Sequence, residues 1–420
     1  MAKVFELEQK YKVHDPERLL LALKGICGLE SEESFDVDIY FSDCAGTYIH
    51  NNTCLRLRIS EKSESVTLDY KGPSADTSAV RIAKTESNIV ISHSDLDATK
   101  DLLSVLGYVE FVTVKKKRRT FHMHGEEATI SYQVDEVDGA GFFVEVEVLG
   151  QNEAELEKLE LVLESSIKRL GNLSLTPVTE PYRDIVAREH RKKIISKETE
   201  AVAFDLDGTL LPFSNLIFFE SWRSALNEFG INVQRLTYEA YLEQEVDGEE
   251  TLLQQLMNEV NQFERTHLSA RADEIYLQKL RRFLKDADIV ALFKSVEIIK
   301  RSRKTALVTH SKERFINALR EQIDLDEYFN LVLGREELEK LKPDPLPYLM
   351  AAEKLDVDVS KMLVVEDSAK GIQAGLKAGS RVLAIGKPLD TSGSVPYVAS
   401  CVQLGLLLEG MYSIGEDTDG

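Results

Sequence analysis

The sequence predicts two domains of different fold class. The N-terminal domain is predicted to be an antiparallel β-barrel or tunnel with outer helices (α+β). The C-terminal domain is predicted to be a Rossmann-like α/β domain with a parallel sheet and an inserted helical cap. The length of 420 residues exceeds what one hydrophobic core usually supports. Residues 1–150 alternate apolar and charged positions between turn signals. Beyond residue 195, short apolar runs that end in acidic or hydroxyl residues alternate with amphipathic helical patterns, as in a parallel sheet.

The predicted domain boundaries are residues 1–190 and 198–420. Between them lies the charge-rich run Arg188–Lys197, which we interpret as a linker. Helical patterns interrupt the N-terminal strands, at about 15–26, 94–107 and 152–170. Residues 214–292 are almost wholly helical in pattern and interrupt the α/β alternation, so they predict an inserted cap.

The composition argues against several classes of protein. Apolar residues make up 43% and charged residues 29%, which is ordinary for a soluble globular chain. The formal net charge of -21 argues against a general binder of nucleic acid or anionic membranes, because a negative field repels phosphate polymers. No apolar run approaches the ~18 residues of a membrane span, and the N-terminus has no signal-peptide pattern. The four cysteines lack C-x-x-C spacing, so we expect reduced thiols in a cytoplasmic protein.

Acidic and hydroxyl side chains end the apolar runs of the C-terminal domain. Asp205 ends one run and Asp207 follows it in a turn, while Thr309 ends a second run. A third run ends in Glu366-Asp367, and Lys342 lies between the second and the third. Ligands of open α/β sheets bind at the carboxyl ends of the strands. Together these residues supply a nucleophile, an acid/base, a hydroxyl, a cation and metal ligands, which is what phosphoryl transfer needs.

This half of the chain closely resembles the haloacid dehalogenase (HAD) superfamily over roughly residues 199–400. The resemblance rests on four ordered motifs, D-L-D-G-T-L at 205–210, L-V-T at 307–309, L-K-P-D-P at 341–345 and V-V-E-D-S-A-K-G-I-Q-A-G at 364–375. It implies that Asp205 attacks phosphorus to form an aspartyl-phosphate and that Asp207 exchanges protons with the leaving group and water. It also implies that Thr309 and Lys342 hold phosphoryl oxygens. The implied Mg²⁺ ligands come from Asp205, Asp207, Glu366 and Asp367.

The second aspartate of the first motif selects the reaction. Breaking a C–O–P bond needs a proton donor and expelling halide does not, so Asp207 favours phosphatase or phosphomutase chemistry. The helical insert resembles the small cap of the phosphoglycolate phosphatase and β-phosphoglucomutase-like branch. In that branch an acidic-Ser pair usually follows D-G-T-L and one more residue, whereas this chain has Leu211-Pro212-Phe213-Ser214. The particular phosphate monoester therefore stays open.

Charged rows alternate with apolar rows along the N-terminal strands. In the first strand Glu6, Glu8 and Lys10 share one face, opposite Leu7 and Tyr11. Similar charged pairs recur along the chain, at Arg56/Arg58, Asp69/Lys71, Lys116/Arg118 and Glu145/Glu147. If the strands close into a barrel with helices outside, these rows must line its interior. Buried charges must be paired or coordinated, and a metal–triphosphate complex satisfies both signs of charge.

Residues 1–187 resemble the CYTH family of triphosphate tunnel enzymes, especially its class IV adenylyl cyclase branch. The matching segments are E-L-E-Q-K at 6–10, D-I-Y-F at 38–41, L-R-L-R at 55–58, D-Y-K-G-P at 69–73, K-K-K-R-R-T-F at 115–121, D-E-V-D-G-A-G-F-F-V-E-V-E at 135–147 and E-P-Y-R-D-I-V at 180–186. The resemblance implies that Mg²⁺ or Mn²⁺ is bound by Glu6, Glu8, Glu145 and Glu147. It implies that the phosphates are clamped by Lys10, Arg56, Arg58, Lys71, Arg81, Lys116 and Arg118, with Asp135 helping to position them.

The resulting hypothesis is a bifunctional metal-dependent phosphohydrolase acting on small phosphorylated metabolites and triphosphates. Its CYTH part would hydrolyse thiamine triphosphate, inorganic triphosphate or a nucleotide. One alternative is an adenylyl cyclase, which forms cyclic AMP and pyrophosphate from ATP, fused to the phosphatase. Another alternative is a triphosphate-sensing domain that regulates the phosphatase. The sequence leaves the substrates, the coupling of the domains and the oligomeric state open.

Overall fold

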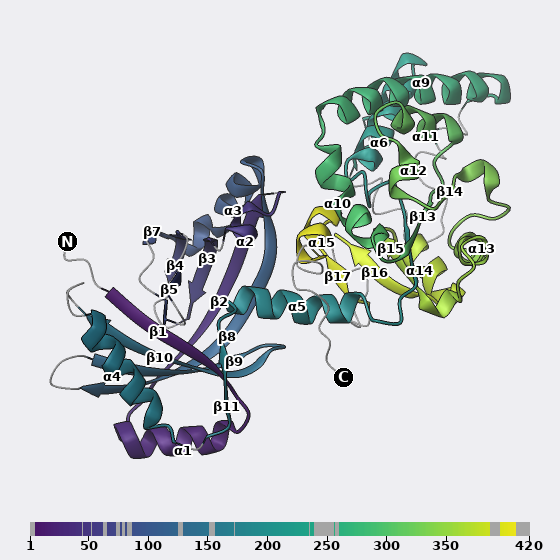
Figure 1. Cartoon of the computed structure of the whole chain (residues 1–420). Helices are drawn as coiled ribbons and strands as arrows, with labels where there is room; N and C mark the ends of the chain where they lie inside the picture. Colours follow the sequence, from purple (N-terminus) through teal and green to yellow (C-terminus); the bar gives the residue numbers. More distant parts are fainter. Residues whose placement is uncertain are drawn as a thin grey trace. The chain divides into compact units, whose positions relative to one another are not determined.

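The computed structural model divides the chain into two compact units, one extending to Lys193 and the other spanning Ile194–Leu408 (Figure 1). The residues it describes are 5–43, 45–51, 53–61, 65–72, 76–77, 80–81, 86–124, 129–150, 156–171, 173–234, 236–238, 256, 260–386 and 395–408. None of the helices within these ranges combines the length and the apolar character needed to cross a membrane.

The first unit is built on one antiparallel sheet, as predicted. Its strands are β1 (Phe5–Val13), β2 (Glu32–Asp43), β3 (Cys54–Ser60), β4 (Ser65–Lys71), β5 (Asp76–Thr77), β6 (Val80–Arg81), β7 (Glu86–Ile91), β8 (Tyr108–His124), β9 (Thr129–Val137), β10 (Gly141–Gly150) and β11 (Leu175–Val178). Their order in the sheet is β5-β6-β1-β10-β9-β8-β2-β3-β4-β7, and β11 pairs with β1. In the register of β1 and β10, Glu8 lies opposite Glu147 and Lys10 lies opposite Glu145.

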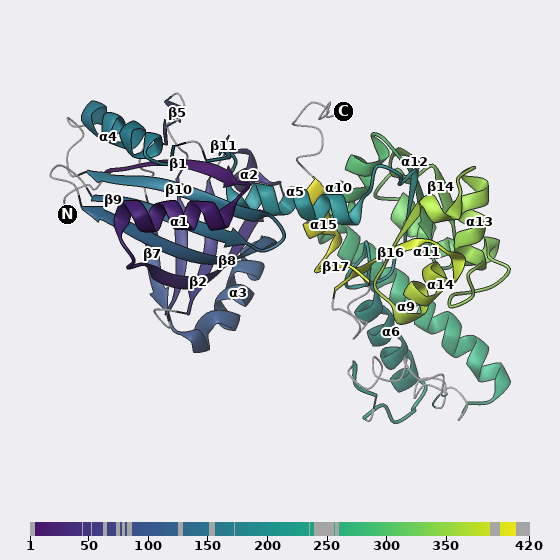
Figure 2. The ribbon, with the colours of Figure 1, turned by 90° about the horizontal axis from the view of Figure 1, so that it is seen from below.

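Helices cover the apolar face of this sheet. The helices of the unit are α1 (Pro16–Cys27), α2 (Thr47–His50), α3 (Leu96–Val105) and α4 (Leu156–Lys168), and α5 (Tyr182–Ile194) begins in it. Leu19 of α1 and Leu163 of α4 join one core with the apolar row of β1 and β10, which includes Leu7, Val144 and Val146. Figure 2 shows α1 and α4 against these strands. Because successive side chains of a strand point to opposite faces, the charged rows lie on the other face.

The run interpreted as a linker is mostly helical. Helix α5 continues to Ile194, so Arg188–Ile194 lie in its second half and an irregular segment follows only from Ile195. Arg, Lys and Glu are good helix formers, and a charge-rich run without Pro or Gly therefore extends a helix that has already begun. The two units nevertheless divide within this run, between Lys193 and Ile194, so the segment that joins them is largely helical.

The second unit contains a six-stranded parallel sheet, which confirms the predicted fold class. Its strands are β12 (Ala201–Phe204), β13 (Lys304–Val308), β14 (Leu331–Leu333), β15 (Met362–Glu366), β16 (Arg381–Ile385) and β17 (Tyr397–Val398), in the order β14-β13-β12-β15-β16-β17. The central strand β12 is buried over its whole length, as expected for a parallel sheet with helices on both faces. One face packs on α13 (Leu346–Lys354) and α14 (Ala369–Ala378), whereas α10 (Ile289–Lys300) packs on β13 and on α15 (Cys401–Leu408).

The helical insert has a core of its own. Helices α6 (Ser214–Glu228) and α9 (Gln262–Asp286) pack together through residues that include Phe219, Trp222 and Leu268. The segment predicted as the cap ends inside α10, which belongs to the layer on the parallel sheet. Among the described residues, the remaining short helices are α11 (Glu313–Arg320) and α12 (Leu325–Tyr328), and the 3₁₀ turns are η1 (His93–Asp95), η3 (Arg335–Glu337) and η4 (Val359–Lys361).

The parallel register brings three strand ends together. Phe204, the last residue of β12, lies opposite Leu307 of β13 and Val365 of β15. Asp205 directly follows Phe204, the pair Glu366-Asp367 directly follows Val365, and Thr309 follows Val308, the last residue of β13. They therefore emerge at one edge of the sheet from three adjacent strands.

Candidate functional site

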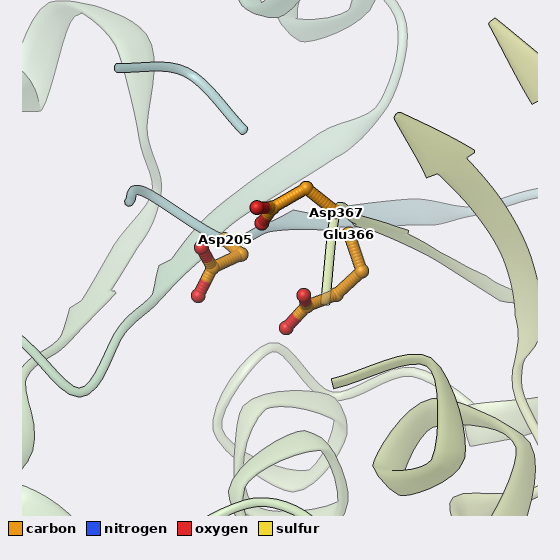
Figure 3. Close-up of side chains that lie close together, drawn as sticks. All are labelled: Asp205, Glu366 and Asp367. Atoms are coloured by element: carbon orange, nitrogen blue, oxygen red, sulfur yellow. The ribbon is translucent and has the colours of Figure 1, made fainter. Parts of the chain in front are cut away.

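Three carboxylates converge at this edge of the parallel sheet. Asp205, Glu366 and Asp367 each offer an oxygen atom, and these oxygens all lie within 4.8 Å of one another (Figure 3). In the parts of the chain that the structure describes, it is the only group of three His, Cys, Asp or Glu residues with this geometry. Burial raises the pKa of Asp205 well above its usual value; Lys342 opposes the rise, and Glu366 and Asp367 add to it. Burial and the charge of Glu366 likewise raise the pKa of Asp367 to about 7.

Lys342 supplies the positive charge at the cluster. Its Nζ donates to Oδ1 of Asp205 at 2.6 Å, to Oε1 of Glu366 at 2.6 Å and to the carbonyl oxygen of Val308 at 2.9 Å. The hydroxyl of Tyr348 donates to the same Glu366 oxygen at 2.7 Å. Burial alone would lower the pKa of Lys342, but Asp205 and Glu366 raise it well above its usual value. The lysine is therefore a buried cation held between two carboxylates.

Asp207 is held apart from the three-carboxylate cluster. Its Oδ2 accepts from the hydroxyl of Ser311 at 2.6 Å and from that of Thr309 at 3.4 Å. Its Oδ1 accepts from the hydroxyl of Tyr276, on the cap helix α9, at 3.4 Å. The side chain that the sequence assigned to both proton transfer and metal binding thus lies among hydroxyl groups. That environment suits proton transfer.

A second constellation lies on the charged face of the antiparallel sheet. A cavity of about 270 Å³ opens there. Its walls include nine of the residues expected to bind metal or phosphate, Glu8, Lys10, Arg56, Arg58, Lys71, Lys116, Arg118, Glu145 and Glu147. The side chains of Glu6 and Arg81 lie outside the described part of the structure, although the backbone of Arg81 pairs with Glu8. The charged rows of five strands thus face one space.

Arg118 links two acidic residues at the wall of this cavity. Its Nη2 donates to Asp135 and to Glu145, both at 2.6 Å, and its Nε donates to Asp135 at 2.7 Å. Asp135 is fully buried behind Arg118 and also accepts from the hydroxyl of Tyr182 at 2.9 Å. The Nζ of Lys10 lies 4.3 Å from the centre of the Tyr182 ring. Asp135 therefore orients a cavity residue without lining the cavity itself.

The carboxylates of the cavity crowd one another. Burial raises the pKa of Glu147, Ser131 opposes the rise, and the charges of Glu8 and Glu145 add to it. Burial also acts to raise the pKa of Glu145, but Arg118 and Lys10 outweigh it and the pKa falls. A divalent cation would relieve the repulsion around Glu147, and its preferred ligands are carboxylate oxygens of this kind.

Two family models match the chain. Residues 199–379 match haloacid dehalogenase-like hydrolases, and residues 5–182 match the CYTH domain. A phosphorylated carbohydrates phosphatase of Thermotoga maritima is 30% identical over 223 residues, which cover 50% of this chain and 99% of that protein. The chain is a CYTH domain joined to a haloacid dehalogenase-like hydrolase. A phosphoglycolate phosphatase of Chromobacterium violaceum is 27% identical over 45% of this chain and 86% of its own length. A protein of Methanocaldococcus jannaschii, provisionally named an adenylate cyclase, is 27% identical over 41% of this chain and 91% of its own length.

Two glycines of the hydrolase domain let the carboxylates approach the backbone. Gly208 has a φ of +87°, and a Cβ there would collide with the carboxylate of Asp367. A Cβ at Gly371, in the first turn of α14, would collide with the carboxylate of Glu366. Asp367 is held by the hydroxyl of Thr209 at 2.9 Å. The glycines of D-L-D-G-T-L and S-A-K-G are thus explained by steric exclusion of any larger side chain.

Several site residues were not assigned from the sequence. In the hydrolase domain these are Thr209, Tyr276, Ser311 and Tyr348; in the CYTH domain they are Asp38, Tyr40, Gln133, Tyr182 and Arg183. Ser311 was detectable as a second hydroxyl just beyond a strand end, and Asp38 as the charged residue of D-I-Y-F. Tyr276 carried no signal, since it lies in a long helix far from any motif.

Proposed function

We propose that this protein is a bifunctional metal-dependent phosphohydrolase, with a phosphate monoesterase in the hydrolase domain and a triphosphatase in the CYTH domain. The observation that carries the proposal is the division of labour among carboxylates in the hydrolase domain. Asp205 lies in a charged cluster with Lys342, whereas Asp207 lies among hydroxyl groups. One carboxylate is thus suited to attack phosphorus and the other to move a proton.

The hydrolase domain carries the residues for an aspartyl-phosphate route. Lys342 holds Oδ1 of Asp205, so the attack on phosphorus would come from Oδ2. Lys342 also offsets the negative charge that an incoming phosphate brings to a buried site. Asp207, oriented by Ser311, would protonate the leaving oxygen and later take a proton from the water that cleaves the intermediate.

Asp205, Glu366 and Asp367 would hold Mg²⁺, a hard cation that prefers carboxylate oxygens. The raised pKa of Asp205 and of Asp367 supports this assignment, because crowded buried carboxylates are stabilised by a cation among them. The bound ion would neutralise charge on the phosphoryl group. The nucleophile, the proton donor and the cation that offsets the phosphate charge are each side chains of this domain.

The substrate of the hydrolase domain is proposed to be a small phosphorylated metabolite. The matched relatives named for phosphorylated carbohydrates and phosphoglycolate support this class. Tyr276 reaches Asp207 from the cap helix α9, so the cap contributes to the wall around the leaving group. The chain departs from its branch at Pro212-Phe213, which leaves the choice among such esters to experiment.

The CYTH domain is proposed to bind and hydrolyse a triphosphate. Its cavity gathers Lys10, Arg56, Arg58, Lys71, Lys116 and Arg118 around one space, as the recognition of a polyanion requires. Glu8, Glu145 and Glu147, with Glu6, would hold Mg²⁺ or Mn²⁺. Adenylyl cyclase chemistry is the second candidate, and the name of the Methanocaldococcus relative favours it.

A panel of substrates with separate detection of orthophosphate, pyrophosphate and cyclic AMP tests both assignments. Asp205→Asn is expected to abolish hydrolysis of phosphate monoesters and to leave the reaction with triphosphates unchanged. Glu8→Ala is expected to do the reverse. Asp286→Asn, at an exposed site in α9, and Glu160→Ala, at an exposed site in α4, are the matched controls.

Each product identifies one candidate. Orthophosphate from tripolyphosphate or thiamine triphosphate supports the triphosphatase, and cyclic AMP with pyrophosphate from ATP supports the cyclase. Tight binding of tripolyphosphate without any product would favour the sensing domain. Monoester hydrolysis that survives Asp205→Asn would refute the phosphatase assignment.

A further inference from the structure

Arg183 is a buried cation at the wall of the CYTH cavity. It lies in the first turn of α5 and is 4% exposed. Its Nη1 donates to the carbonyl oxygen of Thr53, and its Nε donates to Oδ1 of Asp184 at 3.0 Å. Its Nη2 is buried and has no hydrogen-bond partner in the parts of the chain that the structure describes. The residue thus holds two bonds to protein and has a further donor to offer.

Such a donor is unusual in a folded protein. Buried polar groups almost always have a hydrogen-bond partner, and a buried guanidinium has five N–H bonds to satisfy. The groups that bind guanidinium best are planar or tetrahedral oxyanions, which accept two N–H bonds at once. At a cavity wall, the ligand class that Arg183 fits is therefore an oxyanion such as a phosphate.

Two further cations, Arg56 and Lys71, line the cavity with Arg183. Cys54, at the start of β3, lies opposite Lys71 of β4, and Arg56 follows two residues later on the same face. Burial raises the pKa of the Cys54 thiol; Arg56, Arg183 and Lys71 oppose that rise, and Asp38 adds to it. The pKa of the Glu147 carboxylate is instead affected by the charges of Glu8, Glu145 and Arg118. Arg56, Lys71 and Arg183 thus line the cavity near Cys54, whereas Glu8, Glu145 and Glu147 line it on β1 and β10.

We propose that Arg183 binds the phosphate group of the ligand that lies farthest from the carboxylates of β1 and β10. The inference rests on the proposed triphosphate-binding function of this domain and gives it a length requirement. A ligand with three phosphorus atoms spans the cavity from the carboxylates to Arg183. A ligand with two leaves Arg183 without contact. Arg183 is therefore a specificity-determining residue that distinguishes triphosphates from diphosphates.

Binding of two non-hydrolysable probes by the full chain tests this role. The probes are the triphosphate analogue in which methylene groups replace both bridging oxygens and methylenediphosphonate, each measured by calorimetry with Mg²⁺. Arg183→Met is expected to weaken binding of the three-phosphorus probe roughly 10- to 100-fold. Binding of the two-phosphorus probe is expected to change less than about 3-fold, because the lost bond is to the third phosphorus.

Arg188→Met is the matched control. Arg188 lies on the same helix and pairs with Glu180, and it does not line the cavity. It is expected to bind both probes like the unaltered protein. Arg183→Lys keeps the positive charge but loses the planar set of N–H donors. We expect it to weaken binding of the three-phosphorus probe by less than Arg183→Met does. If Arg183→Met does not fold, binding of the two probes by Arg183→Lys serves as the test.

The outcomes separate this inference from the proposed function. An unaltered protein that binds neither probe would refute the triphosphate-binding function and the inference with it. Strong binding of the three-phosphorus probe by the unaltered protein, with the same affinity in both Arg183 variants, would refute only the inference. An equal loss for both probes would make Arg183 a structural residue and would likewise overturn its role in measuring ligand length.

Discussion

Arg58 and Asp38 form a two-pronged ion pair inside the CYTH domain. Nε and Nη2 of Arg58 donate to the two carboxylate oxygens of Asp38 at 2.6 and 2.8 Å. Arg56 donates to the same carboxylate at 3.4 Å, and the Nζ of Lys116 lies 3.9 Å from it. Asp38 is 1% exposed, so one buried carboxylate holds three cavity cations in place.

Removing this carboxylate is expected to destabilise the CYTH domain selectively. Asp38→Ala leaves buried cations without their shared counter-charge, and we expect it to lower the free energy of unfolding by about 3–5 kcal/mol. Asp38→Asn keeps one acceptor and is expected to cost less. The only tryptophan, Trp222, lies in the cap of the other unit. The denaturation midpoint measured by circular dichroism should therefore shift, while the midpoint measured by Trp222 fluorescence stays unchanged. A shift in both transitions would contradict the assignment.

Lys342 is expected to be essential for monoester hydrolysis. Lys342→Met removes the cation between Asp205 and Glu366, and we expect kcat to fall roughly 10²- to 10³-fold, as for other lost electrostatic contacts to a reacting group. Lys340→Met is the control, since the exposed Lys340 pairs with the half-buried Asp344. Steady-state rates with a chromogenic monoester check the prediction. A Lys342→Met protein with a normal kcat would contradict it.

The collision at Gly208 gives a prediction with an internal control. Gly208→Ala adds a left-handed backbone penalty of about 1–2 kcal/mol and a clash with Asp367, so we expect lost monoesterase activity as well as lower stability. Gly230 has a φ of +77°, and a Cβ there would meet no atom within 4 Å. Gly230→Ala should therefore show the stability loss alone. Thermal unfolding and initial rates measure the two effects. Equal activity in both variants would rule out the steric role of Gly208.

His310 is expected to make the hydrolase domain sensitive to mild acid. Its Nε2 accepts the backbone N–H of Lys342 at 2.9 Å, and burial, followed by the charge of Lys342, lowers its pKa to about 4. The unfolded chain binds the proton near pH 6.5 and the folded domain only near pH 4. Stability from this group is therefore complete above pH 6.5 and is lost as the pH falls toward 4.

The measurement for His310 is the denaturation midpoint reported by Trp222 at pH 7.5 and at pH 5. The midpoint of the unaltered protein should fall more between these values than that of His310→Asn, which cannot take up a proton. Nuclear magnetic resonance of the imidazole gives the pKa directly. A value near 6.5 in the folded protein would overturn the prediction.

The sequence predicted those parts of the fold and the site that depend on local order. Alternation along β1 and β10 placed Glu8 and Lys10 opposite Leu7, and the structure has the same two faces. Asp205, Glu366 and Asp367 were assigned to one pocket because parallel strands end at one edge, and their oxygens lie together. Both results follow from the period of a strand and the polarity of a sheet.

Contacts between distant segments could not be predicted in this way. Tyr276 reaches Asp207 only because the cap folds back over the sheet, and Arg183 reaches Thr53 across 130 positions of sequence. The charge-rich run Arg188–Lys197 was interpreted as a linker, and the two units divide within it, between Lys193 and Ile194. Its helical structure as far as Ile194 was not predicted, because the composition is polar while the helix propensity of its residues lets α5 continue.

The continuity of α5 determines where this chain can be divided. Its first residue, Tyr182, is part of the cavity wall, while the carbonyl oxygen of its last residue, Ile194, accepts from Nη2 of Arg381 in β16 at 3.0 Å. A protease or a gene truncation that cuts at residue 190 would leave a helical stub of about two and a half turns on one fragment. The other fragment would begin with a frayed end and a weakened anchor at Arg381. Independent halves are better obtained by ending the first fragment after Ile194 and starting the second before Arg188, so that both retain the shared segment.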